Sequence, residues 1–216
     1  MSDLVVSSNE IDALVKKAAK GAGMAWGLAA DAGKAARWLA DHGLPGPEVI
    51  ADLLDWRDGR DHAAVAPPDV SLSWADHGAV LDPIVVGTVC ADLAERLAAG
   101  PTELGTVQRP VLLGFALAVA ARRTGTPLVA GWAGAELAVD AEGATVAGAD
   151  DALLDSAVAV SVRPGTGRGR RLIGPDRGWS VDGEAWARLE RYAHRTYAPD
   201  TEQSRLTGAG AGLIDD

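Results

Sequence analysis

The feature that most constrains the fold is a change in hydrophobic pattern at Pro127. Before this residue, apolar side chains recur with helical spacing; after it come short apolar runs separated by Gly-rich turns, which are typical of strands. The predicted helices cover 7–20, 24–41, a short segment from Pro47, 84–99 and 110–123, and the predicted strands cover 128–132, 136–139, 144–146 and 157–162. Helices followed by strands favour an α+β fold over alternating βαβ units.

We therefore predict one α+β domain over 1–216. Its N-terminal helices pack beside a small, mainly antiparallel sheet, and a C-terminal helix over 183–196 leads into a Gly-rich tail. Ser7 and Glu10 form a capping-box pattern at the first helix. Gly33, inside the second helix, predicts a close helix crossing. The polar loop 57–69 is a possible hinge between subdomains.

Charge and composition exclude several classes of partner. The formal net charge of −10 argues against nucleic acid and anionic membrane surfaces. The charge is uneven, because 163–205 hold nine arginines and six acids, a net charge of +3. A small anionic molecule would favour this basic segment.

The location of the protein is predicted from its single cysteine and its hydropathy. Cys90 alone allows neither an internal disulfide nor a cysteine-based zinc site. The N-terminus shows no basic region followed by an apolar run, and the longest apolar run, 110–121, is too short to span a bilayer. We expect a cytoplasmic protein without a membrane partner.

Chemically versatile side chains are densest in the last stretch of the chain. Arginine forks suit carboxylates, a phenol can exchange a proton, and alternating glycines can form an anion-binding backbone nest. The stretch contains His194, Arg195, Tyr197, Ser204, Arg205, Gly208, Gly210 and Gly212. The alternative is that the Gly-Ala end of the chain is simply disordered.

Several sequence motifs resemble one known family. They are SNEI at 8–11, GAG at 21–23, WGLA at 26–29, and the tail motifs RTYAP at 195–199, SR at 204–205 and GAGAG at 208–212. Together they resemble an uncharacterised bacterial family catalogued only as a domain of unknown function. The resemblance carries no activity, but it favours an ordered tail.

Metal and nucleotide sites are not supported by residue spacing. The Asp-His pairs Asp41-His42, Asp61-His62 and Asp76-His77 lack the spacing of metal ligands, and helix caps or loops explain them equally well. Ser204 lacks the context of a serine nucleophile. The Gly/Arg loop 163–171 lacks the phosphate-loop pattern. We expect no metal and no cofactor.

Our first hypothesis is a small-molecule metabolic enzyme of the lyase, isomerase or hydrolase type. Arg195, Ser204, Arg205 and the Gly208–Gly212 backbone would hold a carboxylate-like metabolite. Tyr197 would be the general acid or base, assisted by Asp31 or His194. The alternative for Asp31 is a surface helix acid. The alternative for the arginines is pairing with acids such as Asp200 and Glu202.

Our second hypothesis is a non-catalytic accessory or oligomerisation protein. Its C-terminal arm would dock on a pathway partner or on a second copy of the chain. The Ala-rich composition and the Gly-rich terminal arm support this alternative.

Overall fold

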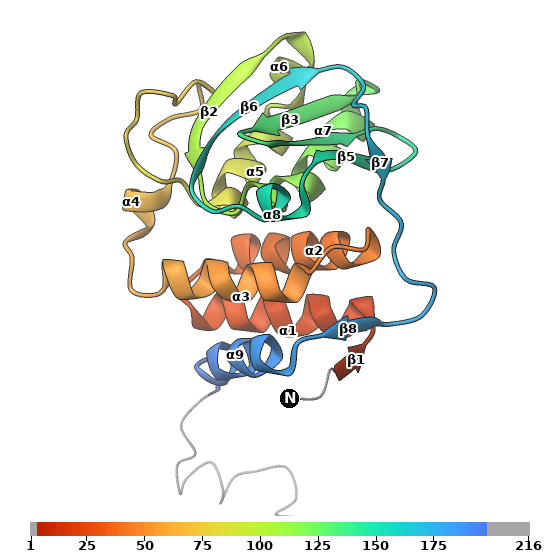
Figure 1. Ribbon diagram of the computed structural model, residues 1–216. Coiled ribbons are helices and arrows are strands. Elements are labelled where there is room, and N and C mark those ends of the chain that lie inside the picture. Colours follow the sequence, from red (N-terminus) through yellow and green to blue (C-terminus); the bar gives the residue numbers. More distant parts are fainter. Residues whose placement is uncertain (1–3, 198–216) are drawn as a thin grey trace, which may run out of the picture.

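The computed structural model describes residues 4–197, and these form two layers (Figure 1). One layer contains α1 (Ser8–Gly21), α2 (Trp26–Asp41), α3 (Gly46–Arg57) and α9 (Gly183–His194). The other contains a six-stranded sheet with α5 (Pro83–Asp92), α6 (Ala94–Ala99) and α7 (Gly114–Thr124). The predicted α+β class, with N-terminal helices beside an antiparallel sheet, is confirmed.

The strands of this sheet follow the order β2-β6-β3-β4-β5-β7, and each neighbouring pair is antiparallel. The bounds are β2 (Thr102–Val107), β3 (Leu128–Trp132), β4 (Ala135–Val139), β5 (Ala144–Gly148), β6 (Val158–Pro164) and β7 (Arg170–Arg171). A separate pair joins β1 (Leu4–Val6) to β8 (Trp179–Val181). Two short helices, α4 (His62–Val65) and α8 (Asp150–Leu153), lie in connections.

The first helices form as their sequence predicts. The Ser7 hydroxyl accepts a hydrogen bond from the Glu10 backbone N–H at 3.3 Å, and the Glu10 carboxylate accepts one from the Ser7 N–H at 2.8 Å. This capping box satisfies N–H groups that an uncapped helix leaves unpaired. Gly33 marks a close crossing of α1 and α2, because a Cβ there would lie 2.4 Å from the Asp12 carboxylate.

Several elements differ from the sequence prediction, which also lacked the short elements β1, β8, α4 and α8. The helix predicted over 84–99 breaks at Leu93 into α5 and α6. The helix predicted over 110–123 begins as a 3-10 turn, η1 (Pro110–Leu113), after Arg109 adopts a left-handed backbone with φ 46°. Strand β2 was not predicted. Its register with β6 shifts at Gly105, where a φ of 72° interrupts the regular pleat.

Candidate functional site

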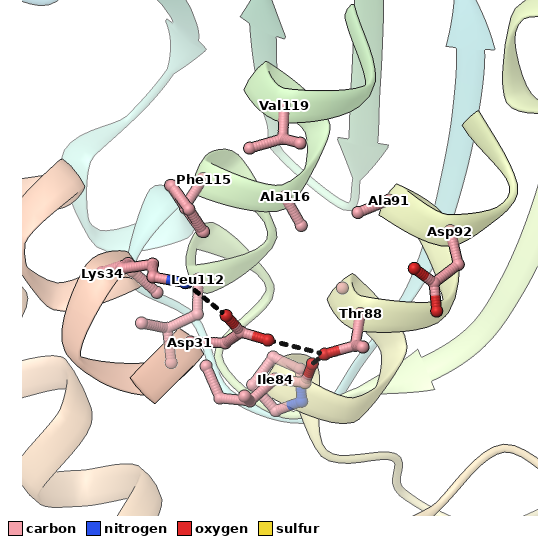
Figure 2. Close-up of a pocket in the computed structure, with 13 residues that line it drawn as sticks. Asp31, Lys34, Ile84, Thr88, Ala91, Asp92, Leu112, Phe115, Ala116 and Val119 are labelled. Atoms are coloured by element: carbon pink, nitrogen blue, oxygen red, sulfur yellow. Dashed lines mark hydrogen bonds and ion pairs between the residues drawn. The ribbon is translucent and has the colours of Figure 1, made fainter. Parts of the chain in front are cut away.

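A cavity of about 220 Å³ lies between α2, α5, η1 and α7 (Figure 2). Most of its wall is apolar, and a few polar groups lie on one side. The apolar lining includes Ile84, Ala91, Leu112, Phe115, Ala116 and Val119. An apolar hollow with few converging polar groups is the usual form of a small-molecule site.

Glycines set the spacing of the helices around this cavity. A Cβ on Gly87 would lie 3.0 Å from the Ala116 Cβ, so α5 approaches α7 closely at that point. A Cβ on Gly114 would lie 2.3 Å from the Trp38 ring, so the start of α7 sits directly against α2. Larger side chains at either position would change the helix spacing and the cavity with it.

Asp31 is the central polar group of the cavity. Its carboxylate oxygens lie 3.1 Å from Lys34 Nζ and 3.4 Å from Thr88 Oγ1. The Thr88 hydroxyl is also 2.9 Å from the Ile84 carbonyl oxygen. The Asp31 and Lys34 side chains are 33% and 51% exposed, so this polar side is open to solvent. Asp92, on α5, is the second carboxylate of the lining.

Sequence reasoning identified Asp31 but missed Thr88, Asp92 and Phe115. A signal for two of them was present: Thr88 and Asp92 are the only polar side chains in PIVVGTVCAD and are four residues apart, so they share one helix face. Phe115 carried no such signal, because an aromatic residue in an apolar helix is equally typical of the core.

The C-terminal residues predicted for the site lie elsewhere. Arg195 donates to both carboxylate oxygens of Asp58, at 2.7 and 3.0 Å, and its guanidinium lies 4.5 Å from the Tyr192 ring centroid. The rings of His194 and Tyr197 meet edge to face at 5.3 Å. These residues lie at or just after the C-terminal end of α9, which packs on α1 and α3, whereas Asp31 faces α5. The structure therefore does not bring Asp31 together with His194 and Tyr197.

The remaining predicted tail residues lie outside the described part of the chain. They are Ser204, Arg205, Gly208, Gly210 and Gly212, together with the alternative acidic partners Asp200 and Glu202. For Arg195, the acidic partner in the structure is Asp58, a residue that the sequence did not single out.

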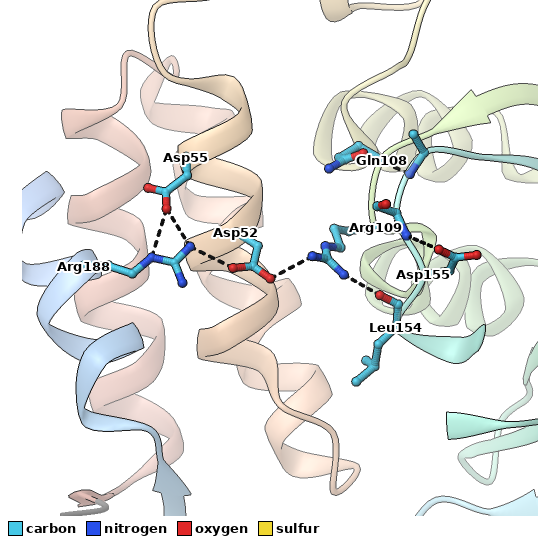
Figure 3. A network of polar contacts seen from close by, with 9 residues as sticks. Asp52, Asp55, Gln108, Arg109, Leu154, Asp155 and Arg188 are labelled. Carbon is cyan, nitrogen blue, oxygen red and sulfur yellow. Dashed lines mark hydrogen bonds and ion pairs between the residues drawn. The ribbon is translucent and has the colours of Figure 1, made fainter. Parts of the chain in front are cut away.

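A polar network joins α3 to α9 and to the sheet layer (Figure 3). Arg188 on α9 donates to Asp52 at 2.8 Å and to Asp55 at 2.6 Å. Asp52 also accepts from Arg109 at 2.8 Å, which connects the two layers. The Tyr192 hydroxyl donates to Asp55 at 2.8 Å. Burial and the neighbouring Asp55 carboxylate raise the pKa of Tyr192 to about 12.

A buried ion pair connects the end of α3 to the start of α5. Arg57 and Asp82 form this pair with side chains only 4% and 0% exposed. Asp82 also caps α5 by accepting from the Ile84 N–H at 2.8 Å. The loop 57–69, predicted as a possible hinge, therefore begins at a residue anchored in the protein interior.

The N-terminal motif residues hold helices together. Ser8 hydrogen-bonds to Asp41, and Asn9 accepts from Arg37 at 2.9 Å, so the start of α1 is tied to the end of α2. A Cβ on Gly21 would lie 1.8 Å from the Tyr192 carbonyl oxygen, so this glycine permits the contact between α1 and α9. These residues serve packing, and they lie away from the cavity wall.

Comparison with known families gives one match. Residues 6–73 match the model of a family described as a protein of unknown function (DUF3726). The resemblance to a family of unknown function is thereby confirmed over α1 to α4, which include Asp31 and Lys34 but not the α5 and α7 walls of the cavity. Neither the curated proteins nor the solved structures compared with the chain give a match.

Two further features concern residues 4–197 only. Within them, His, Cys, Asp and Glu side chains form no group of three or more arranged to hold a metal ion. Over the same range, the helices are too short or too polar to cross a membrane.

Proposed function

We propose that this protein binds a small, largely apolar molecule in the Asp31 cavity. The observation that carries the proposal is the combination of an apolar hollow between α2, α5, η1 and α7 with a partly exposed carboxylate, Asp31, at its side. A cavity of about 150 Å³ holds a benzene molecule, so about 220 Å³ suits a ligand of roughly nine or ten non-hydrogen atoms.

The same geometry supports a cofactor-independent enzyme of small-molecule metabolism. Asp31 would accept a proton from the bound molecule, the general-base role predicted from the sequence. Lys34, 3.1 Å away, would stabilise the carboxylate before the transfer. The observation that favours this role is the open acceptor side of Asp31 next to the apolar wall.

The C-terminal hypotheses remain predictions. An anionic metabolite held by Arg195, Arg205 and the glycines would bind at a place separate from the Asp31 cavity. Docking of the terminal arm on a partner or a second copy is likewise a separate prediction, because the arm lies beyond residue 197.

Ligand-detected NMR with phenethyl alcohol tests the binding proposal. This neutral aromatic alcohol has about the size that the cavity accepts. Ala91→Leu fills the cavity from its half-buried α5 position, and Ala98→Leu, half-buried on α6 away from the cavity, is the matched control. We expect binding to the natural protein and to Ala98→Leu, and at least a tenfold loss in Ala91→Leu. Binding unaffected by Ala91→Leu would reject this cavity as the site.

A further inference from the structure

We infer that the ligand of the Asp31 cavity is a primary amine in its protonated form. This inference rests on the proposed binding function and names the chemical class of the ligand. It is carried by the hydrogen-bonding capacity of Asp31, by the charges around the cavity, and by the apolar character of the remaining wall.

The hydrogen bonds of Thr88 leave Asp31 with acceptor capacity. A threonine hydroxyl has one proton, and the Ile84 carbonyl at 2.9 Å is a closer acceptor than Asp31 at 3.4 Å. The Asp31 oxygen that faces Thr88 therefore receives at most a weak, shared hydrogen bond. A ligand ammonium group could donate to this oxygen and also approach the Thr88 oxygen, which keeps its acceptor lone pairs.

The charges of the lining favour a cation over an anion. Figure 2 shows the Asp31 and Asp92 carboxylates on either side of Thr88, both on the polar side of the hollow. Lys34 is the single cation of the lining that the structure describes, and its exposed side chain already neutralises part of Asp31. The formal sum of two acids and one lysine is −1, which disfavours a carboxylate ligand and attracts an ammonium group.

The apolar wall defines the rest of the ligand. Phe115 and Val119 lie along α7, apart from the two carboxylates, whereas Leu112 lies beside Asp31 (Figure 2). A hydrocarbon or aromatic body would cover these side chains while its amine reaches Asp31. Such a ligand matches both the polar and the apolar side, whereas a sugar or a polyphosphate would leave polar groups against hydrocarbon.

Three ligands that share a phenethyl group test the inference by isothermal titration calorimetry: phenethylamine, phenethyl alcohol and hydrocinnamate. They share the phenyl body and differ in carrying a positive, a neutral or a negative group. We expect phenethylamine to bind at least about tenfold more tightly than the alcohol, because a charge-assisted hydrogen bond contributes more than a neutral one. Hydrocinnamate should bind most weakly.

Two variants test which side chains cause the preference for the amine over the alcohol. Asp31→Asn should remove most of the preference for the amine over the alcohol, because it removes the negative charge and keeps the size of the side chain. Lys34→Met should strengthen amine binding several-fold, because Lys34 competes with the ligand for Asp31. A wild-type protein that binds the alcohol as tightly as the amine would overturn the amine assignment and leave the proposed function standing. Binding of none of the three would overturn both.

Discussion

Two groups of acidic side chains in this protein differ in how fully they are paired. Along α3, Asp52 and Asp55 share Arg188, and Asp58 at the end of the helix pairs with Arg195. In the cavity, Asp31 has one exposed lysine and a shared threonine hydroxyl. The α3 acids face the arginines at α9, whereas Asp31 faces a largely apolar hollow.

A dense group of charged side chains therefore does not by itself indicate a binding site. The basic C-terminal segment was predicted to attract an anionic ligand, yet Arg188 and Arg195 bind carboxylates of α3. Their positive charge is used in docking α9. Binding capacity is instead found where a polar group lies beside an apolar cavity and keeps unused acceptor sites.

The largest loss of stability should follow from breaking the buried Arg57–Asp82 ion pair at the end of α3. Arg57→Ala leaves the Asp82 carboxylate uncompensated in the interior, and breaking a buried pair in this way costs about 3–5 kcal/mol. Lys34→Ala, which removes the exposed partner of Asp31, should change the unfolding free energy by less than about 0.5 kcal/mol. Urea unfolding of both variants measures the contrast.

A second substitution separates lost charge from lost packing. Burial raises the pKa of the Asp82 carboxyl, while Arg57 and the backbone N–H groups of Ile84 and Val85 lower it. Adding Asp82→Asn to Arg57→Ala removes the unpaired charge and keeps a side chain that can cap α5. The double variant should be more stable than Arg57→Ala alone. Equal or lower stability would mean that the buried charge is not the cause.

The second largest loss of stability is expected at the junction of α3 with α9. Asp55→Ala removes the acceptor of both the Tyr192 hydroxyl and the Arg188 guanidinium. Arg188 keeps Asp52, and Asp55 is half exposed, so we expect a loss of about 1–2 kcal/mol. Asp31→Ala is the matched control and should lose less than about 0.5 kcal/mol. Equal losses in the two variants would remove the distinction between the fully paired acids of α3 and the less fully paired Asp31.

Local signals were sufficient to predict much of the fold. The Ser7–Glu10 capping box, Gly33 within α2, and the Gly-bounded runs that became β3 and β4 each reflect interactions within a few residues or one helix crossing. Strand β2 was missed because its hydrogen bonds come from β6, more than fifty residues later, and its bulge at Gly105 disrupts the alternation. A strand that depends on pairing with a distant segment is only weakly indicated by its own sequence.

The cavity could be predicted only in part for the same reason. Asp31 was identified as a potential base from its position near a family-like motif, but its partner Thr88 is 57 residues away along the chain. The apolar wall comes from α5 and α7, whose sequences are typical of any buried helix. What makes these residues a site is the spacing that Gly87 and Gly114 allow between helices, and such spacing depends on the assembled fold.

The smallest loss of stability should follow from breaking the exposed Asp58–Arg195 ion pair at the end of the α3–α9 junction. This loss depends on pH. The hydrogen bond from Arg195 lowers the pKa of the Asp58 carboxyl below its ordinary 3.8. A lowered acid pKa contributes stability that is present above the unfolded-state pKa and is lost as pH falls through the folded-state value. Arg195→Gln should therefore be slightly less stable than the natural protein near neutral pH, and this gap should close as pH falls below 3.8 and through the folded-state pKa of Asp58. Urea unfolding of both proteins across this range measures the gap. A gap that stays constant into acid would mean that Arg195 stabilises α9 through its contact with the Tyr192 ring instead of through the charge of Asp58.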